Sequence, residues 1–177
     1  MAATLARQGN FEEAQELLRA GVKELESLPD LATSPGSQFA LAQGHFALAQ
    51  MLAEQPEKLD AALAEFKLAV EIGQQAIRAS NSAGEDAPFA ANVTRMHYNY
   101  GLALLKLERL NDAYRELLAV YKAEPQSTDY LWALGSVLIA QERWGEAEKC
   151  YEELVDRDPY NLAFRQSLEQ IRRQNQQ

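Results

Sequence analysis

Three side chains in this sequence carry chemistry that could serve a catalytic or metal site: His45, His97 and Cys150. Two histidines hold zinc on one helix when they lie four residues apart, but His45 and His97 fall on different predicted helices. Cys150 follows Ala147 by three residues on the apolar side of a predicted helix, so we expect its thiol to pack in the core. We expect His97 to be half-buried with its hydrogen bonds satisfied. The sequence therefore predicts no metal site and no cofactor, and we expect that the protein is not an enzyme.

Composition and charge argue against several other classes of function. The chain has 177 residues and a formal net charge of −9, which disfavours nucleic-acid binding because phosphates attract basic surfaces. No apolar run approaches the ~18 residues that a membrane-spanning helix needs, and no secretory signal is visible. A single cysteine leaves no internal disulfide framework. We therefore expect no membrane insertion, and the cytoplasm is the default expectation for the compartment.

The elements that must position any functional side chain follow from an internal repeat. The segments 94–127 and 128–161 match along their length with a period of 34 residues, which is the mark of a solenoid. The matched pairs are Gly101 and Gly135, Leu104 and Leu138, Ala113 and Ala147, Leu117 and Tyr151, Val120 and Leu154, and Pro125 and Pro159.

The types of the repeated residues indicate two helices in each unit. A glycine inside an apolar helical run costs about 1 kcal/mol relative to alanine, so we expect a second helix to approach Gly101 and Gly135 closely. The small Ala113 and Ala147 suit the contact face of that second helix. A proline then ends the unit, because the residue before proline leaves helical space. Each unit is therefore predicted to be a pair of antiparallel helices.

These small, aromatic and proline positions resemble the tetratricopeptide repeat (TPR) family. The resemblance implies an all-α fold, a right-handed superhelical solenoid of antiparallel helix pairs whose concave groove is lined by the first helix of each unit. Two units match the family closely and two loosely, giving about three and a half repeats. We expect a single domain over residues 1–177, made of a half repeat (1–28), a long atypical repeat (37–80), two further repeats (88–127 and 128–161) and a capping helix (162–175).

The half repeat at the start resembles a turn and second helix without a first helix. Its apolar face, from Leu17 to Leu28, would then lie partly uncovered, which is a liability at a solenoid end. We expect that the chain was cut from a longer array, or that it self-associates through this half repeat. The alternative is an ordinary N-terminal helix that docks on the next pair.

The next pair departs from the family spacing. Gly44 is assigned the role of the repeated glycine, in a helix over residues 38–53, and the second helix is predicted over residues 57–79. Gly44 precedes Ala62 by 18 residues, whereas Gly101 precedes Ala113 by 12. The following helix is predicted to begin at Pro88 and to reach Leu107.

The resemblance places the partner-binding surface on the first helices. We expect Tyr98, Trp132 and Arg95 to contribute most, because tyrosine, tryptophan and arginine dominate interfaces, with Lys106 able to receive an acidic group. The alternative is that Tyr98 and Trp132 pack between repeats. The predicted groove consists of Leu41, His45, Arg95, Tyr98, Asn99, Leu102, Lys106, Trp132 and Ser136.

The expected ligand is a protein. Peptide-binding members of the family hold a terminal carboxylate with lysine, arginine and asparagine side chains, and here only Asn99 and Arg95 match that set. An extended or helical peptide with apolar anchors suits the predicted groove better. We therefore predict a protein–protein interaction scaffold without catalysis. The alternative is an accessory TPR segment of a larger enzyme or redox protein, such as a multihaem cytochrome.

Overall fold

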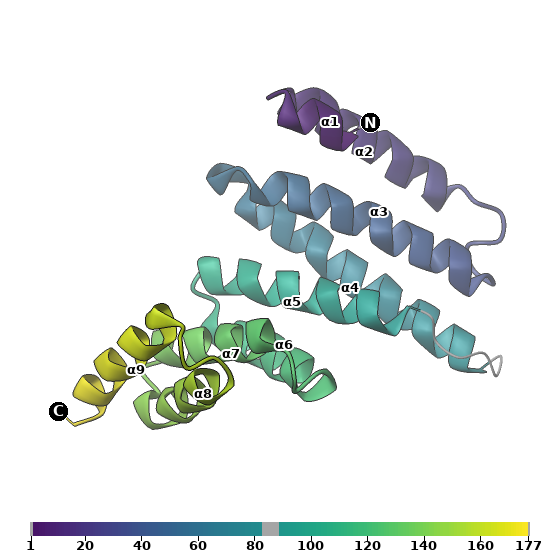
Figure 1. The fold of residues 1–177 in the computed structure, drawn as a ribbon. Coiled ribbons are helices and arrows are strands. Elements are labelled where there is room, and N and C mark those ends of the chain that lie inside the picture. The colour runs from purple at the N-terminus through teal and green to yellow at the C-terminus, as the bar shows by residue number, and fades with distance from the viewer. Residues whose placement is uncertain (1, 83–88, 177) are drawn as a thin grey trace. The chain divides into compact units, whose positions relative to one another are not determined.

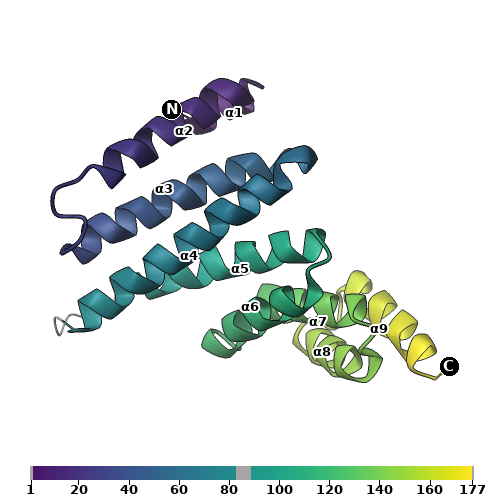
Figure 2. The ribbon, with the colours of Figure 1, turned by 180° about the vertical axis from the view of Figure 1, so that it is seen from behind.

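The computed structural model describes residues 2–82 and 89–176, and this part of the chain consists of helices joined by short turns, with no strand. The helices pack into two compact units, unit 1 (Met1–Ala103) and unit 2 (Leu104–Gln177). Figures 1 and 2 show the helices of both units from opposite sides. The all-α fold of antiparallel helix pairs predicted from the 34-residue period is confirmed.

Unit 1 is built around one long apolar helix. Its elements in chain order are α1 (Ala2–Arg7), α2 (Phe11–Glu26), α3 (Pro35–Ala53), a 3-10 turn (Pro56–Lys58), α4 (Leu59–Ser82) and α5 (Ala90–Lys106), the last three residues of which belong to unit 2. Helix α3 packs against both α2 and α4, as Figure 1 shows. Ser34 caps it by accepting a hydrogen bond from the Ser37 amide, and Pro35 occupies its first turn.

The core of unit 1 explains why α3 is apolar on nearly every side. Phe39, Leu48 and Leu52 are buried in it, and the ring of Phe46 lies 5.8 Å from that of Phe66 in α4. A helix covered on two sides is apolar over most of its circumference, and only its solvent-facing side carries polar residues.

Unit 2 repeats one hairpin plan. It contains α6 (Leu110–Ala123), α7 (Thr128–Ala140), α8 (Trp144–Arg157) and α9 (Leu162–Asn175), with α8 packed between α7 and α9. Ser127 caps α7 by accepting from the Tyr130 amide, and Asn161 caps α9 by accepting from the amides of Ala163 and Phe164. The repeated apolar positions of α6 and α8 are buried: Ala113, Leu117, Val120, Ala147, Tyr151 and Leu154.

Three turns share one backbone geometry. Gly9, Glu108 and Glu142 have φ angles of 86°, 56° and 58°, the left-handed conformation that ends many helices. In each turn the next amide donates to a carbonyl five residues back, from Asn10 to Leu5, Arg109 to Leu104 and Arg143 to Leu138, at 2.9–3.0 Å. Helix α1 therefore ends as the first helices α5 and α7 do.

This geometry corrects the prediction that residues 1–28 hold a second helix alone. Helix α1 is six residues long and packs against α2, in the place of a first helix. Helix α1 is not predicted from the sequence, because so short a segment shows no helical periodicity.

The assignment of Gly44 to the repeated glycine position is wrong. A Cβ on Gly135 would lie 2.9 Å from the ring of Tyr151, in the second helix of the same pair. A Cβ on Gly44 would instead lie 3.1 Å from Val22, in the preceding helix α2. The residue of α3 that faces its own second helix is Phe46, so the register of α3 differs from the predicted one by two residues.

The remaining helix bounds lie near those predicted. Helix α3 begins at Pro35 and α4 extends to Ser82, each three residues beyond expectation. The predicted helix start at Pro88 lies outside the described residues. None of the helices in the described ranges is long and apolar enough to cross a bilayer.

Candidate partner-binding surfaces

The two groove residues predicted on α3 are buried in unit 1. Leu41 and His45 lie in the core, because a shift of two residues turns a helix face by about 200°. The prediction that Leu41 and His45 line the groove is therefore corrected. The side of α3 and its C-cap that reaches solvent carries Gln43, Ala47, Gln50 and Glu54 instead.

Both histidines take part in packing contacts between helices. His45 Nδ1 lies 2.6 Å from a carboxylate oxygen of Glu65 in α4 and donates to it. His97 Nε2 lies 2.8 Å from the amide nitrogen of Gln74; because that nitrogen can only donate, the imidazole nitrogen accepts. Each imidazole thus links neighbouring helices of unit 1.

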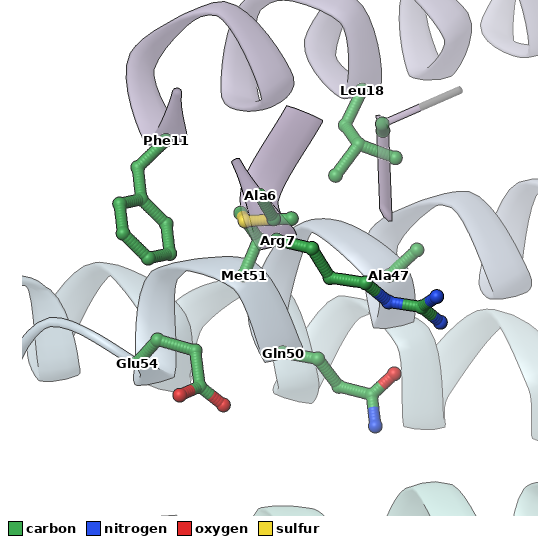
Figure 3. A pocket seen from close by; sticks show the side chains of 9 residues that line it. Ala6, Arg7, Phe11, Leu18, Ala47, Gln50, Met51 and Glu54 are labelled. Carbon is green, nitrogen blue, oxygen red and sulfur yellow. The ribbon is translucent and has the colours of Figure 1, made fainter. Parts of the chain in front are cut away.

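A cavity of about 640 Å³ opens between α1, α2 and α3 in unit 1. Figure 3 shows Phe11, Met51, Ala6 and Leu18 around its interior. Arg7, Gln50 and Glu54 form a polar rim, and Figure 3 places Arg7 and Glu54 on opposite sides of it. The lining residues are Ala2, Ala6, Arg7, Phe11, Leu18, Ala47, Gln50, Met51 and Glu54.

Small side chains create this cavity. Counted from the shared turn, Ala6 of α1 occupies the position that holds Leu105 in α5 and Ile139 in α7. Ala47, on the exposed side of α3, also lines the cavity. The sequence alone does not predict this cavity, because the alignment of Ala6 with the later first helices depends on the turn geometry that only the structure shows.

Four predicted groove residues lie on α5 within unit 1. Arg95 is exposed, with its guanidinium carbon 5.7 Å from the centre of the Phe46 ring and Nη2 donating to the Asn92 side chain at 3.2 Å. The Asn99 amide donates to the Arg95 carbonyl at 2.9 Å. Tyr98 and Leu102 are half-buried. The stacking on Phe46 orients the Arg95 guanidinium while leaving it accessible.

The other three predicted residues lie in unit 2. Trp132 of α7 is 42 % exposed, and Lys106 at the end of α5 is exposed. The Ser136 hydroxyl donates to the Trp132 carbonyl at 2.9 Å within the helix. An indole this accessible is a surface feature, in contrast to the buried aromatic Tyr151 of the next helix.

The electrostatic environment of Cys150 in unit 2 does not favour a reactive thiol. Burial, with the nearby carboxylates of Glu153 and Glu146, raises the pKa of the Cys150 thiol to about 11, so the thiol stays protonated at neutral pH. Throughout the described residues no cluster of three histidine, cysteine or acidic side chains could hold a metal ion.

Comparison with known proteins places the fold. The model of the tetratricopeptide repeat family matches residues 98–161, the stretch in which the 34-residue period is clearest. No curated protein matches the sequence.

Several solved structures share the fold at low sequence identity. The chain is similar to MamA from Desulfovibrio magneticus RS-1, with 20% identity over 99% of this chain and 81% of that one, and a TM-score of 0.62. It is similar to the TPR-like repeats of a putative kinesin light chain from Podospora anserina, with 18% identity over 98% and 82% of the two chains and a TM-score of 0.65. A thermophilic TPR protein from Thermus thermophilus matches with 16% identity over 96% and 94%, at a TM-score of 0.50. Residues 98–161 therefore carry the sequence motif of the tetratricopeptide repeat family, and the chain shares the fold of these solved structures.

Proposed function

We propose that the protein is an interaction scaffold that binds an apolar segment of a protein partner on the exposed sides of its first helices. In unit 1 the segment would insert an apolar side chain into the cavity between α1, α2 and α3. In unit 2 an apolar segment would pack on Trp132. The fold is consistent with this role, since binding proteins is typical of the family.

The cavity is the observation that carries the proposal. It combines an apolar interior of Ala6, Leu18 and Met51 with a charged rim at Arg7 and Glu54. Binding pockets commonly have such a composition, because apolar contact supplies the free energy and a few polar groups fix the orientation. Its volume of about 640 Å³ lies within the roughly 300–1,000 Å³ of ligand pockets.

The test is affinity capture from a lysate of the source organism, followed by mass spectrometry. Three variants are compared with the unmodified chain: Ala6→Leu with Ala47→Leu, which fills the cavity; Trp132→Ala; and Tyr98→Ala with Trp132→Ala. We expect each variant to lose at least one protein that the unmodified chain retains. Circular dichroism checks that the helix content is unchanged.

Leu68→Ala is the matched control. Leu68 lies on α4, a second helix, and is 40 % exposed, close to the 42 % of Trp132. It removes a comparable exposed apolar side chain outside the proposed surfaces, so capture should not change. If every variant captures the same proteins as the unmodified chain, the proposed surfaces do not bind partners.

A further inference from the structure

Unit 2 carries two highly exposed apolar side chains, Tyr160 and Leu162, which together are called the apolar projection. Tyr160 is 92 % exposed and Leu162 is 67 % exposed, and they flank Asn161, the cap of α9. Each is far more exposed than the core aromatic Tyr151 or the core leucine Leu168. Two large apolar side chains this accessible on one short segment offer apolar area that a bound partner could cover.

The charges around this projection run in a fixed order along the chain. Asp158 precedes Tyr160 and Arg165 follows Leu162, so an acid, an apolar pair and a base follow one another. In the described part of the chain Arg165 has no ion pair, whereas Arg172 is held by Glu148 and Glu152. The Arg165 guanidinium is therefore available to another molecule.

The cavity of unit 1 has a complementary pattern. Its apolar interior lies between Arg7 on one side and Glu54 on the other, as Figure 3 shows, and neither has an ion pair within the described residues. The wider charge distribution agrees: residues 1–60 carry four basic and nine acidic side chains, and residues 159–177 carry three basic and one acidic. These opposite net charges favour an encounter between the first part of one copy and the last part of another.

We propose that the chain associates head to tail with a second copy of itself, the Tyr160 and Leu162 side chains of one copy entering the cavity of the next. In this contact Asp158 faces Arg7, and Arg165 faces Glu54. The proposal rests on the proposed function in one respect, because it takes the cavity to be a site for apolar protein anchors. It adds the identity of the occupant.

The geometry of such a contact has a consequence for assembly size. The cavity and the apolar projection lie on different parts of the chain, so the contact is heterologous. A complex of two copies therefore still has one unoccupied cavity and one unbound projection. A contact of this kind adds copies stepwise unless a ring closes. Sedimentation velocity should therefore show a weight-average mass that rises with protein concentration.

The decisive experiment mixes two blocked chains. One carries Tyr160→Ser and Leu162→Ser and keeps an intact cavity; the other carries Ala6→Leu and Ala47→Leu and keeps the apolar projection. Each alone should be monomeric, with self-association weakened at least about tenfold. The mixture should form a one-to-one complex and nothing larger, because it contains one usable surface of each kind.

Charge reversal tests the orientation of the contact. Arg7→Glu alone and Asp158→Arg alone should each weaken self-association, and the two changes in one chain should restore it. Added salt should weaken the association of the unmodified chain. If the double reversal associates no better than either single reversal, the assigned pairing is wrong.

Two results would overturn the proposal. The first is an unmodified chain that stays monomeric up to its solubility limit. The second is an assembly that survives the Tyr160 and Leu162 changes but is lost with Leu17→Ser and Leu28→Ser, which would indicate a symmetric contact through α2. If capture from a lysate still depends on the cavity in either case, the proposed function stands and only the occupant is wrong.

Discussion

Gly135 in α7 lies against the ring of Tyr151 in α8, so closely that a Cβ at position 135 would come within 2.9 Å of one ring carbon and 3.2 Å of another. Tyr151 is buried, and its ring is held between α7 and the rest of unit 2. The missing Cβ is what allows a full aromatic ring at this helix contact.

Replacing Gly135 with alanine should therefore destabilise the fold. The added methyl group overpacks a buried contact at a cost of about 1–3 kcal/mol, offset by the roughly 1 kcal/mol that alanine gains over glycine in a helix. We expect a net loss of up to about 2 kcal/mol in the free energy of unfolding, measured by urea denaturation followed by circular dichroism.

Gly21→Ala in α2 is the control for that measurement. No atom lies within 4 Å of a Cβ built on Gly21, so this variant reports the helix propensity alone and should be more stable by about 0.5–1 kcal/mol. Equal effects of the same sign at Gly135 and Gly21 would contradict the close contact with Tyr151.

Glu142→Gly should stabilise the turn between α7 and α8. Glu142 has a φ of 58°, a conformation that costs residues with a Cβ roughly 1 kcal/mol and costs glycine little. We expect a gain of about 0.5–1 kcal/mol in the free energy of unfolding. Glu142→Ala keeps the Cβ and removes the carboxylate; a gain of the same size in that variant would show that charge, and not the backbone conformation, is responsible.

Glu65→Ala should be more damaging than an equivalent change on the same helix. The Glu65 carboxylate accepts from the buried His45 Nδ1 at 2.6 Å, and its loss leaves that donor buried without a partner, at about 1–3 kcal/mol. Glu71 pairs with Lys67 at 3.7 Å on the exposed side of α4, so Glu71→Ala should change stability by less than about 0.5 kcal/mol. Thermal unfolding of the two variants makes the comparison, and indistinguishable midpoints would show that the His45 contact adds no stability.

Cys150 should resist alkylation until strongly alkaline pH. Its pKa is raised from 9.0 to about 11, so the thiolate fraction in the folded protein below pH 9 is roughly 100-fold lower than for an ordinary thiol. Iodoacetamide should modify the folded chain correspondingly more slowly than the urea-unfolded chain, with the rate rising towards pH 11. Because the neutral thiol is favoured in the fold, the associated stability is present below pH 9 and is lost as the pH rises through 11. Equal rates for folded and unfolded protein at pH 8 would contradict the shift.

The sequence was most informative where the period was unbroken. The matches of Gly135 to Gly101 and Ala147 to Ala113 predicted both helices of each pair, because burial imposes the same residue types wherever the same contact recurs. Ala147 is fully buried at the predicted contact.

A single residue type is a poor marker of helix register. Gly44 and Gly135 do not occupy equivalent positions: Phe46 faces the second helix of its pair, and the Phe46–Phe66 contact replaces the Gly135–Tyr151 contact. A glycine identifies a close approach but not the helix that approaches. The wrong register placed His45 and Leu41 on the surface, although both are buried.

The cavity could not be predicted because its walls come from three helices, one of them only six residues long. Alanines such as Ala6 and Ala47 are uninformative until their neighbours in space are known. The exposure of Trp132 and Tyr160 likewise depends on what packs beside them, which the pattern of one helix does not contain.

Residues 128–161 could be duplicated as one unit, because the residue before this segment and the last residue of the segment are both helix caps. The segment starts after one capping side chain, Ser127, and ends on another, Asn161, each of which caps the next helix through its own side-chain oxygen. In a tandem copy inserted after Asn161, the first helix of the copy would be capped by Asn161. The asparagine at the end of the copy would then cap α9. The gene can thus lengthen by in-frame copying of one hairpin without rewriting the residues at either junction, and the array gains a neighbour contact with each added copy.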